Sequence, residues 1–302
     1  MAIAIKDYAH AQGQQVRVGM LVSHLREEEK SILAAARSRG ISVEVLQDRR
    51  LVLDLTGPNP PAVDVVLDRC MAHTRGGYAL RAFERWGIPT INSSSAAATC
   101  DDKIEMTAAL SAAGVPTLQT AVAFSVDGAL EAAEELGYPV VLKPVGGSWG
   151  RLLAKANSAS SLRTILEQKQ QLGSHHHGVF YLQEYVEKPG RDIRVMVVGG
   201  EVIAASYRNA GHWITNVAKG ATSTRCEVTP EIAGIAIDAA RAVGATLAGI
   251  DLVETPDGLK VIEVNSGVEF KGLRTTTDLS IPDVILDHAV SSVVLRRLEV
   301  VA

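Results

Sequence analysis

The sequence predicts an α/β protein of two or three lobes, with a doubly wound parallel sheet in its N-terminal lobe. Two observations support this prediction. Between residues 16 and 91, short apolar runs alternate with helix-like segments, and parallel strands require crossover helices of this kind. The chain also has 302 residues, which exceeds the length that one hydrophobic core normally serves.

The N-terminal elements follow from apolar periodicity and from the glycines that end the helices. Strands are expected at residues 16–22, 41–46, 63–68 and 88–91, and helices at 27–39 and 76–86. The next segment, residues 92–100 with the sequence NSSSAAATC, consists mainly of small residues. It predicts a loop at the boundary between two lobes.

Beyond this loop, strands and helices no longer alternate one for one. Helices are expected at residues 102–112, 127–136, 158–171 and 231–243, with a last helix from 282. Strands are expected at residues 119–123, 140–144, 179–183, 193–198 and 201–206, followed by two apolar strands within 249–265.

The composition is typical of a globular protein, with 47% hydrophobic and 21% charged residues. A net charge of −4 gives no sign of a nucleic-acid or membrane partner, and no apolar run is long enough to span a bilayer. The isolated cysteines Cys70, Cys100 and Cys226 are expected to be reduced core residues. The N-terminal segment lacks a signal-peptide pattern, so a cytoplasmic protein is expected.

A glycine-rich loop follows an apolar strand at residues 141–151, VLKPVGGSWGR. Its backbone N–H groups can surround phosphate oxygens while Lys143 supplies a fixed positive charge. It is not a Walker A loop, because no GK[ST] sequence opens a helix after it. Taken alone, the same residues also fit a tight turn between strands.

Two later strands carry Asp251, Glu263 and Asn265 within very apolar surroundings. An ionised carboxylate buried without a partner is costly, and Mg²⁺ is a natural partner for oxygen ligands. The spacing Glu-x-Asn places both side chains on one face of a strand. Carboxylates at strand ends are also often surface residues. A phosphate loop and a magnesium site on one chain together indicate ATP chemistry.

Two further segments carry polar side chains. Residues 183–200 offer backbone amides to an adenine edge, with Asp192 near a ribose and Arg194 facing phosphates; alternatively, Glu184, Asp192 and Arg194 form a solvated ion-pair face. Residues 207–221 place Arg208, Asn216 and Lys219 around a turn that suits an anionic group. His212 in that turn fits a base or a surface histidine, and residues 175–177 are expected in a solvated loop.

Together these residues resemble the RimK-related ATP-grasp ligases. The resemblance rests on DDK at 101–103, VLKPVGGSWGR, QEYVEKPGRDIRV, HWITN, GIDL and EVN, and within the family it is similar to the LysX/ArgX branch. It implies a three-lobed ATP-grasp fold, with a pre-ATP-grasp lobe at 1–98, a central lid lobe at 99–183 and a C-terminal lobe with the magnesium site at 184–302. ATP would lie between the second and third lobes.

The resemblance also implies roles for individual residues. Lys103 and Lys143 match the phosphate-binding lysines. The phosphate loop is matched by Gly146, Gly147, Ser148, Trp149, Gly150 and Arg151. Glu184, Tyr185 and Val186 match the adenine hinge, and Asp192 matches the ribose contact. Arg194, Arg208 and Asn216 match positions around the phosphates and reacting groups. Asp251, Glu263 and Asn265 match the magnesium ligands.

The activity that the resemblance implies is a carboxylate–amine ligation that consumes ATP. A small acidic LysW-like carrier protein supplies the side-chain carboxylate of its C-terminal glutamate, which becomes an acyl phosphate. The α-amine of α-aminoadipate, glutamate or a related amino acid then attacks. A homo-oligomer is also implied. The alternatives are a RimK-like ligase that adds glutamate to another protein or joins small molecules, and a nucleotide-binding regulator. The regulator predicts damaged magnesium ligands or lysines, and all of these are present.

The chain departs from the family pattern after the magnesium ligands, where it reads EVNSGVEFKGLRTTT. In LysX an Asn-[Ser/Thr] pair, and in ArgX a Gly-Phe pair, selects the acceptor amino acid. Here the pair is Gly272-Leu273. It removes hydrogen-bonding groups and adds an apolar side chain, so an altered acceptor pocket is expected.

Overall fold

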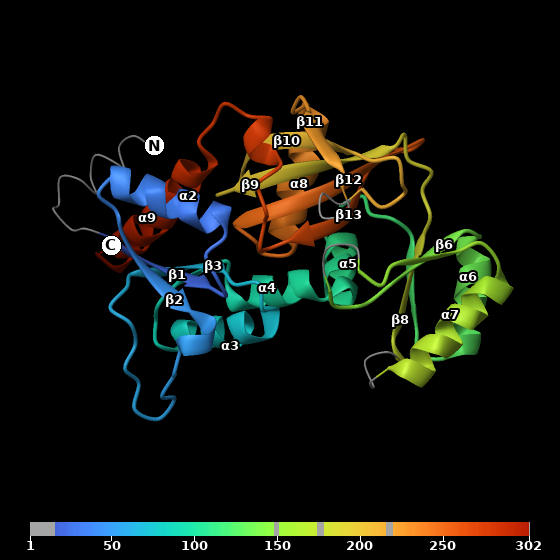
Figure 1. Ribbon diagram of the computed structural model, residues 1–302, viewed down its shortest axis with the longest axis horizontal. Coiled ribbons are helices and arrows are strands. Elements are labelled where there is room, and N and C mark those ends of the chain that lie inside the picture. The colour runs from blue at the N-terminus through green and yellow to red at the C-terminus, as the bar shows by residue number, and fades with distance from the viewer. Residues whose placement is uncertain (1–15, 148–150, 174–177, 216–219, 302) are drawn as a thin grey trace.

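Three β-sheets lie in a row along the computed structural model, and helices cover them (Figure 1). The structure describes residues 16–147, 151–173, 178–215 and 220–301. The N-terminal sheet is at one end, the central sheet is at the other, and the C-terminal sheet lies between them (Figure 1).

The N-terminal sheet is parallel, with the strand order β2-β1-β3-β4. Its strands are β1 (Arg17–Val22), β2 (Ser42–Gln47), β3 (Val65–Arg69) and β4 (Thr90–Ile91), and a short turn η1 (Asp48–Arg50) follows β2. Helices α2 (Glu27–Ser38) and α9 (Ile281–Val301) pack on one face, and α3 (His73–Arg85) packs on the other. This is the doubly wound arrangement that the sequence predicted.

The central sheet is antiparallel, with the order β5-β8-β6-β7. Its strands are β5 (Thr120–Ala123), β6 (Val140–Lys143), β7 (Ala154–Ala156) and β8 (Phe180–Glu184). Helices α6 (Val126–Leu136) and α7 (Ala159–Leu172) pack against it through apolar residues that all come from the range 123–182. The central lobe therefore has a hydrophobic core of its own.

The C-terminal sheet is antiparallel, with the order β11-β10-β9-β12-β13. Its strands are β9 (Arg191–Val198), β10 (Glu201–Asn209), β11 (Thr222–Arg225), β12 (Leu247–Thr255) and β13 (Gly258–Asn265). One core unites it with α8 (Pro230–Ala242), α5 (Lys103–Ala112) and part of α4 (Ser94–Asp101). A short turn, η4 (Leu273–Thr275), follows β13.

Side-chain caps explain where most of these helices begin. Each capping oxygen accepts a hydrogen bond from a backbone N–H of the first turn, which otherwise lacks a partner. The caps are Ser93 for α4, Asp102 for α5, Ser125 for α6, Ser158 for α7 and Thr229 for α8. In α8 the cap is followed by Pro230, whose fixed φ favours the first helical position.

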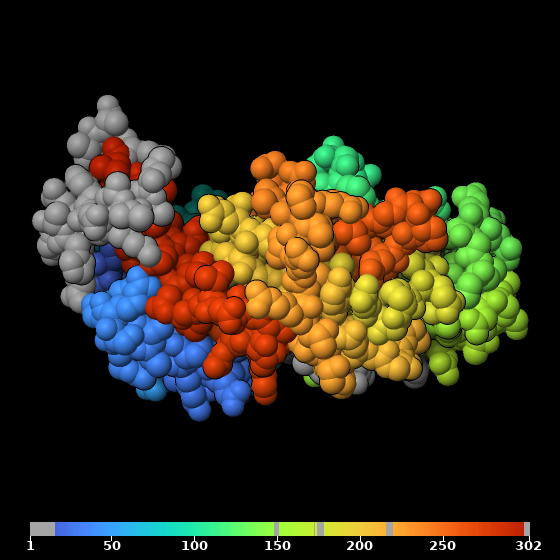
Figure 2. Space-filling model, turned by 90° about the horizontal axis from the view of Figure 1, so that it is seen from above, coloured from blue at the N-terminus to red at the C-terminus, as the bar shows by residue number. Residues whose placement is uncertain are grey.

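The N-terminal and C-terminal sheets share a hydrophobic core. Met20 and Leu67 of the first sheet pack in one cluster with Met196 of the second, and α9 contributes Ile285 and Leu286. Figure 2 shows the C-terminal segment between the N-terminal residues and the C-terminal sheet. These two lobes are therefore joined through apolar packing, whereas the core of the central lobe is separate.

The prediction of a loop at residues 92–100 was wrong, because α4 occupies most of this segment. Ser93 caps this helix, and alanine, the best helix former, fills its centre. Other differences are smaller: α3 begins at His73, and the edge strands β7 and β11 were not expected. The division of the chain at residues 98/99 and 183/184 stays a prediction.

No helix in the described part of the chain is both long and apolar enough to cross a membrane. The three cysteines are free thiols. Cys100 and Cys226 are buried as expected, whereas Cys70 is only partly buried.

Candidate active site

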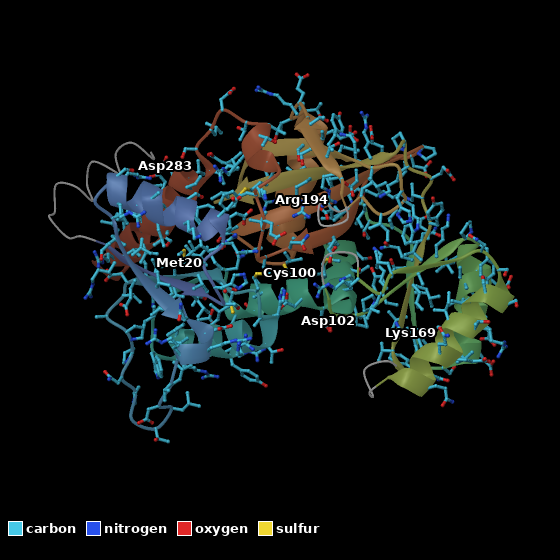
Figure 3. All side chains as sticks on the ribbon, viewed as in Figure 1. Met20, Cys100, Asp102, Lys169, Arg194 and Asp283 are labelled. Carbon is cyan, nitrogen blue, oxygen red and sulfur yellow. The ribbon has the colours of Figure 1, made fainter. Side chains whose placement is uncertain are left out.

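Two cavities border the C-terminal sheet. The inter-lobe cleft lies between this sheet and the central sheet and holds about 810 Å³ of open space. The N-lobe cavity lies between α3, α4 and the segment after β13 and, with the open solvent at its mouth, comprises about 2880 Å³. Arg194 and Cys100, both labelled in Figure 3, are among its lining residues. Gly147, Arg208 and Glu263 line both cavities, so the two spaces meet at these residues.

Two lysines approach the glycine-rich loop from different elements. Lys103 is the first residue of α5, and its Nζ lies 2.9 Å from the carbonyl oxygen of Gly147 and 3.0 Å from Glu263 Oε1. Lys143 ends β6 and is buried. Burial lowers the pKa of Lys143 to about 8; the charge of Lys103 adds to the shift and Glu263 opposes it. Both lysines line the inter-lobe cleft, where they suit a polyphosphate.

Two aspartate–arginine pairs cross the C-terminal sheet. Strand pairing sets Asp192 opposite Arg208 and Arg194 opposite Asp251. Arg208 donates from Nε and Nη2 to the two oxygens of Asp192, at 2.6 and 2.7 Å, and its Nη2 lies 2.9 Å from Asp251 Oδ2. Arg194 Nε lies 2.5 Å from Asp251 Oδ1, and the Thr215 hydroxyl donates to Asp192.

The ion pairs favour the charged forms of Asp251 and Arg208 despite the burial of both side chains. Burial alone would raise the pKa of Asp251, but the charges of Arg194 and Arg208 outweigh it and hold that pKa below its ordinary value. Burial likewise disfavours the charge of Arg208, whereas Asp251 and Asp192 raise its pKa. The sequence left open a solvated face of ion pairs formed by Glu184, Asp192 and Arg194. In the structure, Asp192 pairs with Arg208 and Arg194 pairs with Asp251, and both aspartates are buried. The expected ribose contact of Asp192 stays a prediction, with both its oxygens bound by Arg208.

The three predicted magnesium ligands lie on neighbouring strands. Asp251 is opposite Glu263, and Asn265 is opposite Gly249. Glu263 and Asn265 both line the N-lobe cavity, while Asp251 lines the inter-lobe cleft. Asp251 Oδ1 is buried and makes no aligned hydrogen bond, although Arg194 Nε is close to it. Two carboxylates and an amide oxygen fit a hard cation such as Mg²⁺.

Among the described residues, no three His, Cys, Asp or Glu side chains gather into a metal-binding group. Asp251, Glu263 and Asn265 do not form such a group because the third ligand, Asn265, is an amide. Lys103 and the two arginines lie beside these carboxylates.

The predicted adenine hinge lies at the end of β8, in the wall of the inter-lobe cleft. Glu184 accepts hydrogen bonds from the backbone N–H of Gln119 and from Lys260 Nζ, at 2.9 and 3.2 Å. Tyr185 meets the ring of Trp213 edge-on, with 6.3 Å between the ring centres. Val186 also lines the cleft. The carboxylate of Glu184 is thus bound within the protein, and any contact of this segment with a base is expected through backbone groups.

Gly272 and Leu273, the predicted specificity pair, both line the N-lobe cavity. Leu273 follows Gly272 at the start of η4 and is 1% exposed, because its side chain belongs to the core shared by the N- and C-terminal lobes. Small residues line much of this cavity: Gly77, Ala97, Ala98, Ser206, Ser223, Ser266 and Gly267. The cavity is therefore wide on the side of the expected acceptor.

The sequence did not reveal the buried residues that hold the segment after β13. Glu28 Oε1 accepts hydrogen bonds from the backbone N–H groups of Phe270 and Lys271, both at 2.6 Å. Arg69 donates to the carbonyl oxygen of Val268 at 2.6 Å and pairs with Glu28 at 2.6 Å. The contacts of Glu28 and Arg69 with residues 268–271 join positions roughly 200 or more apart, so no local pattern in the sequence indicates them.

A second anchor of this segment is Asn92. Its amide donates to the carbonyl oxygens of Leu247 and Ser266, and its carbonyl oxygen accepts from the backbone N–H groups of Thr246 and Leu247. We call Glu28, Arg69 and Asn92 the loop anchors.

Several predicted residues lie outside the described part of the chain. These are Ser148, Trp149, Gly150, Asn216, Lys219 and the histidines at 175–177. Gly146 and Arg151, on either side of the first group, line the N-lobe cavity and the inter-lobe cleft, respectively. His212 is exposed, and its ring nitrogen accepts the backbone N–H of Ile214, which fits the surface-histidine alternative.

Two family models cover most of the chain. The LysX preATP-grasp domain matches residues 18–99, and the RimK-like ATP-grasp domain matches residues 100–288. The chain belongs to the RimK-like ATP-grasp family. This confirms the resemblance on which the sequence predictions rest.

The relatives of this ATP-grasp chain include two kinds of LysW ligase. It is 34% identical over 269 residues to the alpha-aminoadipate–LysW ligase LysX of Saccharolobus solfataricus, covering 87% of this chain and 97% of that relative. It is 31% identical over 279 residues to the glutamate–LysW ligase ArgX of Sulfurisphaera tokodaii, covering 90% and 98% of the two chains.

Solved structures confirm the ATP-grasp fold. A RimK domain ATP-grasp protein from Sphaerobacter thermophilus aligns with a TM-score of 0.76 at 23% identity, covering 93% of this chain and 100% of that one.

Proposed function

We propose that this chain is an ATP-dependent ligase of a carrier protein. It activates the side-chain carboxylate of the C-terminal glutamate of a small acidic LysW-like carrier as an acyl phosphate. It then couples this group to the α-amine of α-aminoadipate, glutamate or a related amino acid. The proposal rests on membership of the ATP-grasp family and on the LysW ligases among its relatives.

One observation carries the proposal most directly: the inter-lobe cleft and the N-lobe cavity meet at Gly147, Arg208 and Glu263. A ligase of this kind must bring a nucleotide phosphate, a carboxylate and an amine to one point. The cleft with Lys103 and Lys143 suits the nucleotide, and the wide cavity suits the carboxylate and the amine. Their meeting point has a guanidinium to stabilise negative charge.

In the first step, an oxygen of the carboxylate attacks the γ-phosphorus of ATP, and ADP leaves. Both reactants are anions, so the step depends on positioning and charge neutralisation rather than on a covalent enzyme intermediate. Lys103 and Lys143 bind the polyphosphate, and Arg208 faces the transferred group, with Arg194 beside it. Mg²⁺, when bound by Glu263, Asn265 and Asp251, supplies further positive charge beside the phosphates.

In the second step, the neutral amine attacks the acyl carbon from the N-lobe cavity, and phosphate leaves. The loop anchors hold the segment with Gly272 in the wall of this cavity. Because Gly272 and the neighbouring small residues leave the wall open, we propose that an acceptor larger than glutamate fits as well as glutamate does.

The test is ADP release by the full chain with Mg²⁺, a LysW-like carrier and a panel of free amino acids, read together with the intact mass of the carrier. We expect the carrier mass to rise by one amino acid less water, only with ATP and with one or a few acceptors. ADP release with glutamate or a small acid in place of the carrier would instead support the RimK-like alternative. No ADP release with any pair would contradict the ligase. The homo-oligomeric state and the cytoplasmic location stay predictions.

A further inference from the structure

A histidine and an aspartate, neither of them among the predicted site residues, meet in the wall of the N-lobe cavity. His73 is the first residue of α3, and Asp101 is the last residue of α4. Their side chains are in contact, with His73 Nδ1 2.5 Å from Asp101 Oδ1. Both residues line the N-lobe cavity, and their side chains are 50% and 33% exposed. A molecule in the cavity can therefore reach the pair.

The hydrogen bond fixes the tautomer of the neutral imidazole. The carboxylate of Asp101 accepts a proton from Nδ1, so the lone pair of a neutral His73 lies on Nε2. In the described part of the chain, no hydrogen bond to Nε2 is present. The ring is thus oriented by an acid, as a general base commonly is.

The charged groups around His73 come from three elements. The hydrogen bond and the charge of Asp101 on α4 raise the pKa of His73, and Asp68 at the end of β3 adds to this. Burial and the charge of Lys103 on α5 oppose the rise. The net effect is a pKa above the ordinary 6.5, which makes His73 a stronger base than a free imidazole.

The pair lies on the acceptor side of the glycine-rich loop. A Cβ added at Gly146 would be 3.7 Å from the carbonyl oxygen of Asp101, so the end of α4 runs along this loop. Two residues further on, Lys103 contacts Gly147 and Glu263, where the two cavities meet. The pair therefore lies in the cavity wall close in sequence to Lys103, which contacts two of the residues where the cavities meet.

We propose that His73, oriented by Asp101, is the general base that takes the proton of the acceptor amine; this inference rests on the proposed ligase function. His73 Nε2 first takes one proton from the ammonium of the acceptor and later releases it to water in the open cavity. The neutral amine nitrogen then attacks the carbonyl carbon of the acyl phosphate, and a C–N bond forms. The C–O bond to the phosphate breaks, and the phosphate leaves with the electron pair and takes up the second proton of the nitrogen.

The test compares two acceptors in the full chain with ATP, Mg²⁺ and a LysW-like carrier ending in glutamate. One acceptor is the amino acid, whose ammonium must lose a proton. The other is hydroxylamine, which is largely unprotonated at neutral pH and gives a carrier hydroxamate. For His73→Gln we expect kcat/KM for the amino acid to fall by about 100- to 10,000-fold. Hydroxamate formation should stay at the wild-type rate. The matched control is His24→Gln, because His24 is exposed and does not line either cavity.

A second variant keeps His73 and changes its pKa. In the wild type, kcat/KM for the amino acid should rise with pH as His73 loses its proton. Asp101→Asn should shift this rise to lower pH, because Asp101 raises the pKa of His73.

An equal fall with both acceptors, or no fall with the amino acid, would overturn the role of His73. So would an unchanged pH profile in Asp101→Asn. If the wild type forms no hydroxamate, the proposed ligase function fails first, and the inference fails with it.

Discussion

Lys143 gives the inter-lobe cleft a charge that depends on pH near the physiological range. Burial lowers its pKa from 10.5 to about 8. A polyphosphate favours the charged form, so we expect ATP to bind with proton uptake at pH 8–9 and more weakly as the pH rises beyond 8. Calorimetry in two buffers of different ionisation enthalpy measures this uptake.

The lowered pKa of Lys143 also determines how this residue changes the free energy of unfolding with pH. Because the pKa is lower in the folded chain, the folded state binds fewer protons than the unfolded state between pH 8 and 10.5. The contribution of Lys143 to the free energy of unfolding therefore rises with pH across this window. Lys143→Met should remove both the proton uptake and this rise; proton uptake that persists in the variant would assign it to another group.

Leu273 is a core residue that also lines the N-lobe cavity, at a position where the sequence predicted a wall of the acceptor pocket. Its side chain is 1% exposed in the cluster that joins the N- and C-terminal lobes. Leu273→Ala should lower the free energy of unfolding by about 2–5 kcal/mol, and Leu273→Met by less than about 1.5 kcal/mol. Denaturant unfolding measures both. A stability loss near zero in Leu273→Ala would contradict the core role.

At the scale of elements, α2 holds the segment after β13, which lines the N-lobe cavity, through Glu28. Glu28→Gln keeps the size of the side chain but loses the charge on two hydrogen bonds to Phe270 and Lys271. A charged hydrogen bond contributes about 1.5–3 kcal/mol, so KM for the acceptor should rise by about 10- to 100-fold. Affinity for ATP should stay unchanged, because α2 does not line the inter-lobe cleft.

Glu27→Gln is the matched control. Glu27 is next to Glu28 on the same helix, but its carboxylate is exposed and lies 3.7 Å from the exposed Lys271 Nζ, a pair of little value in water. Equal effects of the two substitutions would contradict the anchoring role of Glu28.

The sequence was sufficient for elements with strong local signals and insufficient for contacts between distant segments. Apolar runs predicted β1, β6 and β12, and apolar periodicity predicted α5 and α8. The prediction of a loop at residues 92–100 was wrong because alanine and serine are common in loops as well as in helices. The ion pairs of Asp192 and Asp251 depend on strand pairing, which a local pattern does not set. The loop anchors and the His73–Asp101 pair require the lobes to be assembled.

At the scale of the whole molecule, the central lobe is the part that we expect to move as a unit. Its core is separate, whereas the other two lobes share one. We expect Mg²⁺ and a non-hydrolysable ATP analogue to slow hydrogen exchange in residues 140–147 and in β8, with little change in β1 and β3. Protection of β1 and β3 equal to that of β8 would contradict a moving central lobe.

The central claim is that phosphate transfer and amine attack occur where the two cavities meet, through an acyl phosphate. The most direct measurement uses a carrier whose terminal glutamate has an ¹⁸O-labelled side-chain carboxylate, with ATP, Mg²⁺ and the acceptor. The account predicts that one ¹⁸O atom appears in each inorganic phosphate released, together with ADP. Unlabelled phosphate, or release of AMP and pyrophosphate, would contradict it.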